Sequence, residues 1–306
     1  MTGTATEFGT VMAMARKSAQ TSARKVSQLH PCFGQEAHNK FGRLHLPVSP
    51  ACNIQCRFCN RAFNKEELRP GVTAGILRPD QAVETVKKAL SLCPEITVVG
   101  IAGPGDTLAT NSAIDAFRAV HRAYPHLIKC LSTNGLLLPD RAEELLEVGV
   151  KTITVTVNAV DPRILEKVVS YIVFEGKRIT GPEMGGILTV RQLEGIRRVS
   201  GLGATVKVNT VLVPGVNDAH IEDIARAASE AGAHVYNIIP LIPQHELSHV
   251  GEPDCDMLQR AREAGARHLE VFQHCKHCRA DACGIPGISE FSRELYGGQM
   301  ETFSHG

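Results

Sequence analysis

The sequence predicts an α/β protein built around a partial or near-complete (β/α) barrel of parallel strands. From residue 43 onward, short β-branched runs alternate with longer amphipathic segments, and about six or seven such units follow one another. Strands that alternate with helices in this way form a parallel sheet. The chain has 306 residues, which suffices for one such barrel with an extension at each end.

Runs rich in β-branched residues indicate the strands, and the plainest is TITVTV at 152–157. The predicted strands are 43–49, 95–101, 127–132, 152–157, 205–213, 234–239 and 268–272. Apolar residues at helical spacing indicate the helices between them. These are predicted at 80–92, 112–123, 139–148, from 161, 192–200, 218–231 and 254–264. Glycines at 181, 185 and 186 indicate an irregular excursion over 171–186, interpreted as a possible lid.

Three regions are predicted along the chain. Residues 1–42 form an N-terminal extension over the barrel mouth, 43–272 the barrel, and 273–306 a cysteine-rich tail. Residues 1–25 contain no continuous apolar stretch, so we expect a polar leader or short helix rather than a secretory signal. Their Arg- and Ser-rich composition leaves an organelle transit peptide as the alternative.

Composition excludes several classes of protein. The 33 Lys and Arg residues balance 32 Asp and Glu residues, which argues against a nucleic-acid partner. No run of about 18 apolar residues occurs, so no membrane partner is expected either. The ten cysteines are clustered, with three at 52–59 and three at 275–283. Clustered thiols indicate metal or redox chemistry, and they predict a reducing, cytoplasmic setting.

The strongest motif is CxxxCxxC, formed by Cys52, Cys56 and Cys59 directly after the first predicted strand. In such barrels the reactive groups lie at the carboxyl ends of the strands. Thiolates are the usual ligands of [4Fe–4S] clusters, and three of them leave one iron open to a small chelating molecule. Zinc is the alternative, although structural zinc prefers four ligands arranged in CxxC pairs.

This motif in this position resembles that of the radical S-adenosylmethionine (SAM) superfamily. The resemblance implies a [4Fe–4S] cluster that binds SAM and cleaves it to a 5′-deoxyadenosyl radical, which abstracts hydrogen. It assigns the cluster to Cys52, Cys56 and Cys59, the first candidate catalytic residues. Arg69 and Glu67 are further candidates: Arg69 could pair with a cluster sulfide or a cofactor carboxylate, or could hold the loop to Glu66 or Glu67. The resemblance also implies contacts to SAM from polar or small residues at the strand ends, namely Gly103, Gly105, Asp106, Ser132, Asn134, Asn158 and Asn209.

From His30 to about Gly287 the chain more closely resembles the NifB family of nitrogenase cofactor maturases. The segments that carry this resemblance include His30-Pro-Cys32, Cys130-Leu-Ser-Thr-Asn-Gly135 and Cys275-Lys-His-Cys-Arg-Ala-Asp-Ala282. The resemblance implies a lyase- or transferase-type reaction that fuses two further [4Fe–4S] clusters around a carbon and an extra sulfur. It also implies that one SAM donates a methyl group and that a second yields the radical that removes hydrogen from it. The expected partners are a cluster donor, an electron donor, and a carrier or scaffold protein that accepts the product. A separate acceptor is expected because the chain ends soon after its CxxC tail.

Cys32, Cys130 and His45 are the candidate ligands of a further cluster, with His30 and His38 as alternatives to His45. A strand histidine alone is more often a core residue than a ligand. Cys275 and Cys278 form a CxxC on a polar tail and are interpreted as metal ligands. A redox dithiol is the alternative.

One departure from the family pattern concerns the segment before Arg69-Pro-Gly71. The family usually carries a cysteine there, whereas residues 60–69 contain none. Glu66 or Glu67 could supply an oxygen ligand, or Cys283 could supply a thiolate from the tail. Because thiolate suits iron–sulfur chemistry better than oxygen does, Cys283 is preferred. A third option is that the protein handles a different cluster or has lost the coupling step.

Three functions therefore remain open: the maturase, a radical SAM enzyme acting on an organic or peptide substrate, and a non-catalytic iron–sulfur scaffold. The polar strand ends favour an enzyme, because a scaffold needs no nucleoside site. The HPC and CxxCRADA segments favour the maturase. Cys93 and Cys255 are interpreted as a small buried hydrophobe and an exposed residue, respectively.

Overall fold

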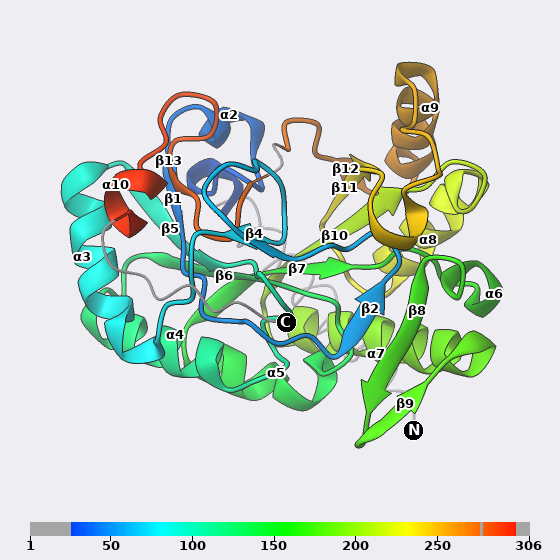
Figure 1. Cartoon of the computed structure of the whole chain (residues 1–306), viewed down its shortest axis with the longest axis horizontal. Coiled ribbons are helices and arrows are strands. Elements are labelled where there is room, and N and C mark those ends of the chain that lie inside the picture. The colour runs from blue at the N-terminus through cyan, green and yellow to red at the C-terminus, as the bar shows by residue number, and fades with distance from the viewer. Residues whose placement is uncertain (1–25, 276–277, 298–306) are drawn as a thin grey trace, which may run out of the picture.

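The computed structural model describes residues 26–275 and 278–297, and its main sheet has the order β12-β11-β10-β7-β6-β5-β1-β13 (Figure 1). The parallel strands are β1 (Gly42–His45), β5 (Ile96–Ile101), β6 (Ile128–Thr133), β7 (Val150–Thr156), β10 (Thr205–Leu212), β11 (Val235–Pro240) and β12 (Glu270–Val271). The short β13 (Cys283–Gly284) pairs antiparallel with β1. Neighbouring parallel strands follow one another along the chain, as in a barrel. Among the described strands β12 and β13 are the two edges, which agrees with the predicted partial barrel.

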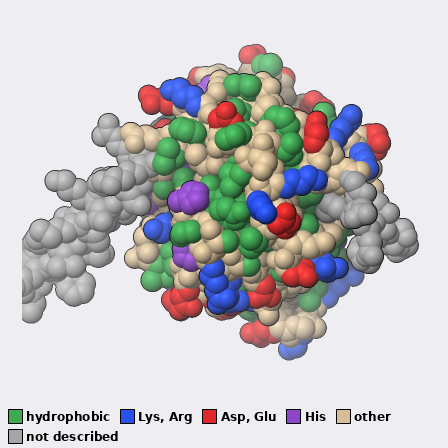
Figure 2. Space-filling view, turned by 90° about the vertical axis from the view of Figure 1, so that its left-hand side faces the viewer, with side chains coloured by type: hydrophobic (Ala, Val, Ile, Leu, Met, Phe, Trp, Pro, Cys, Tyr) green, Lys and Arg blue, Asp and Glu red, His purple; other side chains and the backbone are tan. Residues whose placement is uncertain are grey.

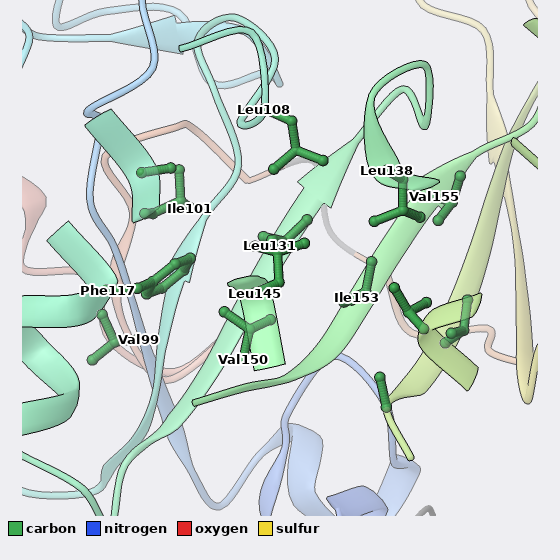
Figure 3. Packing of buried hydrophobic residues seen from close by; sticks show 14 of the residues in the cluster. Val99, Ile101, Leu108, Phe117, Leu131, Leu138, Leu145, Val150, Ile153 and Val155 are labelled. Carbon is green, nitrogen blue, oxygen red and sulfur yellow. The ribbon is translucent and has the colours of Figure 1, made fainter. Parts of the chain in front are cut away.

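Helices connect these strands and cover the sheet. Figure 1 shows α3, α4, α5 and α7 along one side of it. The helical elements of the barrel are η1 (Pro79–Gln81), α3 (Ala82–Leu92), α4 (Ser112–Ala123), α5 (Leu138–Glu147), α6 (Pro162–Leu165), α7 (Gly181–Gly201), η2 (Asp218–His220), α8 (Ile221–Glu230) and α9 (Cys255–Ala266). Their apolar faces pack on strand residues such as Val99, Leu131 and Ile153, with Phe117 and Leu145 supplied by the helices (Figure 3). This packing buries the apolar stripe that the helical periodicity predicts.

Smaller elements lie between and after the barrel units. They are α2 (Gln35–His38), β3 (Ala62–Phe63), β4 (Val72–Thr73), η3 (His245–Leu247) and α10 (Ser292–Tyr296). The strands β3 and β4 pair with each other in parallel, and they bracket the loop that contains Arg69. This pairing holds both ends of the loop together.

The prediction of an irregular excursion over 171–186 is wrong. The segment contains a hairpin of β8 (Val169–Phe174) and β9 (Lys177–Ile179), followed by the start of α7. The turn residues Glu175 and Gly176 have φ angles of 50° and 74°. Positive φ at both residues is the geometry of a tight two-residue hairpin turn, for which glycine is well suited. An alternating strand pattern around Glu-Gly was the available signal.

Glycines made α7 hard to predict, because glycine lowers helix propensity. A Cβ added at Gly185 would lie 2.6 Å from the carbonyl oxygen of Pro162, and one at Gly195 would lie 2.8 Å from the Cβ of Leu138. These glycines therefore let α7 pack closely on α6 and α5. Tertiary packing outweighs the local preference here.

The first strand is shorter than predicted, since β1 ends at His45 rather than at residue 49. The chain then runs on to the cysteines, and Ser49 forms an isolated bridge with Pro104. Part of the cysteine motif is itself a strand, β2 (Ile54–Cys56), which pairs antiparallel with β8. Cys52 thus follows the first strand at a distance rather than directly.

Within the described residues, the surface charge and the helices bear on the expectations of no nucleic-acid stripe and no membrane-spanning helix. On the face shown in Figure 2, acidic and basic side chains are interspersed rather than segregated. No helix in the described part of the chain is long and apolar enough to cross a membrane. The polar leader predicted for residues 1–25 lies outside the described residues, as does 298–306 of the predicted tail.

Candidate functional site

One cavity of about 360 Å³ lies where the parallel strands end. This volume is within the range of small-molecule sites. Most of the site residues predicted from the sequence line it: Cys32, His45, Cys52, Cys56, Cys59, Arg69, Gly105, Asp106, Cys130, Ser132, Asn134, Asn158, Asn209, Cys275 and Cys278. Glu67, Gly103 and Cys283 are not among its lining residues. Folding therefore brings most of the predicted site residues to one cavity.

Residues 52–59, here called the cysteine loop, are held by short-range hydrogen bonds. The Cys59 amide donates to the Cys56 carbonyl at 3.0 Å, which closes a turn between these cysteines. The Gln55 side chain donates to the carbonyls of both residues, at 2.9 and 3.2 Å. Pairing of β2 with β8 fixes the other side of the loop. The spacing of the motif and these bonds together bring three thiols to one wall of the cavity.

The thiols of the cysteine loop are protonated near neutral pH in the metal-free protein. Burial raises the pKa of Cys52 to about 11 and that of Cys56 well above its ordinary value, and it raises the pKa of Cys59 as well. A metal group must therefore displace protons when it binds here. Within the described residues, no three His, Cys, Asp or Glu side chains form a group that could hold a single metal ion. Three thiols lining a cavity are the donor set expected for an iron–sulfur cluster.

The glycine-rich segment after β5 supports the cysteine loop through backbone contacts. Gly105 donates its amide to the Ser49 carbonyl at 2.7 Å, and Asp106 donates to the Ala51 carbonyl at 2.8 Å. A Cβ at Gly105 would lie only 2.0 Å from the Ala51 carbonyl oxygen. Only glycine, which has no Cβ, allows the two backbone segments to come this close. The segment thus positions the chain that leads into Cys52, and these two amides are already engaged.

The Asp106 carboxylate is engaged by groups of the protein. It accepts hydrogen bonds from the Asn134 amide at 2.6 Å, the Leu108 amide at 2.9 Å and the Thr133 hydroxyl at 3.0 Å. Burial raises the pKa of this carboxyl, and these donors oppose the effect. Asn134 in turn donates from Nδ2 to the Asn53 side chain at 2.6 Å. Asp106 therefore positions the end of β6 against the cysteine loop.

Gln192 is a cavity-lining residue that the sequence analysis missed. Its Nε2 donates to the carbonyls of Asn134 and Thr156, both at 2.8 Å. Its Oε1 is buried and has no hydrogen-bond partner among the described residues. A buried amide oxygen without a donor is costly, so this atom is a natural acceptor for a ligand's N–H or O–H. A polar residue on the buried face of a long helix was the only sequence signal.

Two asparagines predicted to contact SAM are tied by their side-chain oxygens to the protein. Asn158 Oδ1 accepts from the Val211 amide at 2.9 Å, and Asn209 Oδ1 accepts from Asn237 Nδ2 at 3.0 Å. Both residues line the cavity, as does Ser132. The groups that can still contact a ligand are the side-chain NH₂ donors of the two asparagines and the hydroxyl of the serine.

A second set of donors lines the same cavity and is here called the auxiliary group: Cys32, His45, Cys130, Cys275 and Cys278. These residues come from widely separated parts of the chain. Cys32 precedes α2, His45 ends β1, Cys130 lies on β6, and the last two belong to the tail. None of the ten cysteines forms a disulfide. Folding therefore gathers the donors that the sequence presents separately.

Hydrogen bonding favours His45 over the other histidine candidates as a metal ligand. Its Nδ1 lies 3.0 Å from the Arg279 carbonyl and must donate to it, which leaves the Nε2 lone pair available. Burial lowers the pKa of His45 to about 4, so the ring is neutral. His30 accepts the Cys32 amide at Nδ1, so its neutral ring carries the proton on Nε2. His38 does not line the cavity.

The residues considered for the missing family cysteine lie outside the cavity. Glu67 forms an ion pair with Arg69 at 2.6 Å, and its side chain is half-exposed. Glu66 accepts a hydrogen bond from the Lys65 amide within its own loop. Cys283 is buried in the main hydrophobic core, because β13 pairs it with Leu44 of β1. The structure therefore corrects the preference for Cys283 as a cluster ligand.

Arg279 and Asp281 form a buried clamp whose role was not predicted. Their side chains pair at 2.8 Å with exposed fractions of 8% and 2%. Arg279 also donates to the carbonyls of Asn64 and Glu67 at 2.6 and 2.7 Å. Asp281 accepts the Ala74 amide at 2.6 Å. The clamp joins the tail that carries Cys278 to the loop that carries Arg69, and so unites two walls of the cavity.

Two buried cations beside the auxiliary group were also missed. Arg43 donates to the Cys278 thiol at 3.5 Å, to the Gly284 carbonyl at 2.7 Å and to Glu290 at 3.3 Å. Lys207 on β10 donates from Nζ to the Cys32 carbonyl at 2.9 Å. A basic residue within a strand gives no sign in the sequence that it will face a cavity.

The family model described as the radical SAM superfamily matches residues 46–228. FeMo cofactor biosynthesis protein NifB from Methanocaldococcus infernus is 43% identical over 269 residues, covering 87% of this chain and 89% of the relative. The protein of the same name from Methanocaldococcus jannaschii is 42% identical over 299 residues, covering 94% and 99%. That from Klebsiella pneumoniae is 44% identical over 266 residues, covering 84% of this chain and 57% of the relative.

Solved structures with little sequence identity share the fold. Streptococcus suis SuiB bound to S-adenosylmethionine aligns with a TM-score of 0.53 and 15% identity, covering 84% of this chain and 54% of that one. A radical SAM methyltransferase from Sphaerobacter thermophilus aligns with a TM-score of 0.51 and 20% identity, covering 76% and 64%. These similarities support the radical SAM barrel architecture and nothing finer.

Proposed function

This chain belongs to the NifB family of the radical SAM superfamily, and from that premise we propose that it fuses two [4Fe–4S] clusters around a SAM-derived carbide. The product would be the precursor of the nitrogenase cofactor. Family membership by itself makes the chain a radical SAM enzyme of FeMo cofactor biosynthesis. The finer proposal rests on one observation: the cysteine loop and the auxiliary group line a single cavity.

Cys52, Cys56 and Cys59 would hold the resident [4Fe–4S] cluster, since their thiols are the matching donor set. When bound, that cluster supplies the electron that cleaves SAM to a 5′-deoxyadenosyl radical. The surrounding residues determine where SAM would lie. Gln192 offers a buried acceptor at Oε1, and Asn134 is held rigidly by Asp106. A wall fixed by internal hydrogen bonds in this way suits the containment of a radical.

The auxiliary group would bind the two substrate clusters. Cys32, His45 and Cys130 form one set, in which His45 presents Nε2 while its Nδ1 proton is held by a carbonyl. Cys275 and Cys278 would bind the second cluster. The family cysteine missing before Arg69 leaves this second set with two thiols. The described residues of that segment that line the cavity, Asn60, Arg61 and Arg69, carry neither a thiol nor a carboxylate. Both substrates would then face the site of SAM cleavage across one shared space.

We further propose three protein partners and a location. Iron–sulfur substrates must be delivered by a cluster donor and the product received by a carrier or scaffold, because such clusters do not survive in solution. An electron donor must reduce the resident cluster. Ten cysteines without a disulfide suit a reducing cytoplasm, and thiolate-bound clusters would make the protein oxygen-sensitive.

The test is anaerobic reconstitution with iron and sulfide, followed by addition of SAM and dithionite. Formation of both S-adenosylhomocysteine and 5′-deoxyadenosine, together with a product that activates cofactor-free nitrogenase, is the expected result. If neither nucleoside forms, a non-catalytic iron–sulfur scaffold is the remaining function. If only 5′-deoxyadenosine forms, the enzyme abstracts hydrogen from an organic substrate. Cys255→Ser, at an exposed cysteine outside the cavity, is the matched control and should behave as the unmodified protein.

A further inference from the structure

Lys207 is a buried cation without a carboxylate partner in the described part of the chain. Its side chain lines the cavity, and the residue is 4% exposed. The ammonium donates to the Cys32 carbonyl and lies 4.8 and 5.6 Å from the ring centres of Phe33 and Phe272. A carbonyl and two ring faces compensate a charge only in part. Burying a charge without a counter-ion is costly, so such a residue calls for an anion.

The geometry places Lys207 beside two thiols of the auxiliary group. Its ammonium donates to the carbonyl of Cys32 itself. Cys32 and Cys130 both pack against the small apolar cluster that contains Phe33 and Phe272, the two rings beside that ammonium. His45 lines the same cavity. Lys207 therefore lies next to the set formed by Cys32, His45 and Cys130.

The other buried cations of the described chain are Arg43, Arg69, Lys129 and Arg279, and each has a carboxylate partner or lies outside the cavity. Arg43 lies beside the same group but has its own carboxylate partner, Glu290, at 3.3 Å. Lys129 is as buried as Lys207, but its ammonium donates to the carbonyls of Tyr124 and Pro125 and does not line the cavity. Among these five described residues, Lys207 alone combines a cavity position with the absence of a described carboxylate partner.

Resting on the proposed function, we infer that Lys207 supplies the counter-charge for the iron–sulfur substrate bound by Cys32, His45 and Cys130. A [4Fe–4S]²⁺ cubane held by two thiolates and a neutral imidazole has no net charge, and one-electron reduction makes it net negative. An ammonium beside it therefore stabilises the reduced form more than the oxidised form. Lys207 is thus a positioning residue that acts on the bound cluster through its charge and is not itself a ligand.

The test uses full-length protein in which Cys52, Cys56 and Cys59 are all changed to Ala, so that only the auxiliary group can take up clusters. Lys207→Met removes the charge and keeps the length, Lys207→Arg keeps the charge, and Lys129→Met is the matched control. After anaerobic reconstitution, two quantities are measured: the rate of iron loss to a chelator, and the reduction potential by an EPR-monitored titration.

Lys207→Met should lose iron about tenfold faster, as outer-sphere substitutions at metal sites commonly do. Its potential should move to more negative values, because the reduced cluster loses its nearest positive charge. Lys207→Arg should restore the potential, and Lys129→Met should leave both quantities unchanged. The metal-free Lys207→Met protein should melt at the same temperature as its parent or higher, since an uncompensated buried charge has been removed.

An unchanged potential in Lys207→Met would overturn the inference while leaving the proposed function standing. A lower melting temperature of metal-free Lys207→Met, with no restoration of the potential by Lys207→Arg, would also overturn it and leave only a structural role. If the parent protein takes up no iron at all, the proposed function and the inference fall together. These outcomes are distinguishable because iron uptake is measured before any potential.

Discussion

The cysteine loop and the auxiliary group line the same cavity but are built in opposite ways. The loop places three thiols within eight residues, fixed by a turn and by the pairing of β2 with β8. The auxiliary group draws on four separate segments, and the tail that supplies two of its thiols is held by the clamp of Arg279 and Asp281. One region is local in sequence, and the other exists only once distant segments have packed.

Their electrostatic surroundings differ too. The auxiliary group lies beside two buried cations, Lys207 and Arg43. Near the cysteine loop, by contrast, Arg61 is exposed and Arg69 is paired with Glu67. The loop is thus a set of thiols in a preformed backbone frame, and the auxiliary group is a set of thiols in a positive field. This difference suggests that the two regions can be disabled separately.

The largest expected effect is the separation of the two regions by removing thiols. Changing Cys52, Cys56 and Cys59 to Ala should abolish 5′-deoxyadenosine formation while iron remains bound at the auxiliary group. Changing Cys32 and Cys130 to Ala should remove the iron of the cluster bound by Cys32, His45 and Cys130, while SAM cleavage continues without coupling. Iron analysis and chromatography of the nucleosides measure both. Loss of all iron in either variant would contradict the independence of the two regions.

The second effect concerns the clamp on the auxiliary side. Asp281→Ala leaves the Arg279 guanidinium buried without its partner and removes the acceptor of the Ala74 amide. We expect a loss of about 3 kcal/mol in the free energy of unfolding, measured by urea denaturation. Asp115→Ala, which breaks an exposed pair with Arg118, is the control and should change stability by about 0.5 kcal/mol at most. Equal losses in both variants would argue against the clamp.

The third effect tests the backbone frame of the cysteine loop. Gly105→Ala forces a Cβ against the Ala51 carbonyl and should lower stability by about 2 kcal/mol, with weaker SAM binding. Gly186→Ala is the matched control, because it lies inside α7 with nothing within 4 Å of its Cβ. It should raise stability by about 1 kcal/mol through helix propensity. Calorimetric melting temperatures distinguish the two results. An unchanged melting temperature in Gly105→Ala would show that the backbone around Ala51 can move to accept the extra Cβ.

The smallest effect is the alkaline stability of the metal-free protein. Burial raises the thiol pKa from 9.0 to about 11 at Cys52 and about 12 at Cys32. The unfolded chain releases these protons first, so stability that is fully present below pH 9 declines as pH rises through these values. Between pH 9 and 10 each thiol should account for about 1 kcal/mol. Cys32→Ala should extend the stable range further than Cys52→Ala. Denaturation midpoints measured at each pH would show the same gain for both variants if the two thiols were equally buried.

The order of strands and helices could be predicted from the sequence because each element carries its own periodic signal. Strands such as β7 and β10 begin or end within two residues of their predicted limits. The cysteine loop was equally accessible, since its three thiols are neighbours in the chain. In both cases the interactions that define the feature join residues close together in sequence.

Where distant residues meet, the sequence left alternatives that only packing resolved. The glycines of α7 weaken its helical pattern, yet they are what permits close contact with α5 and α6. Cys283 has a favourable spacing from Cys278, yet pairing of β13 with β1 buries it in the core. His45 is distinguished from His30 by the hydrogen bond that each ring makes.

The amino-acid sequence by itself determined the barrel order and the local CxxxCxxC motif, because periodicity and spacing are properties of neighbouring residues. Only the tertiary structure decided that Arg279 and Asp281 hold the tail, and that Lys207 faces the cavity from β10. The physical reason is that burial and electrostatic partnership depend on which segments pack together across the sheet. No single segment contains that information.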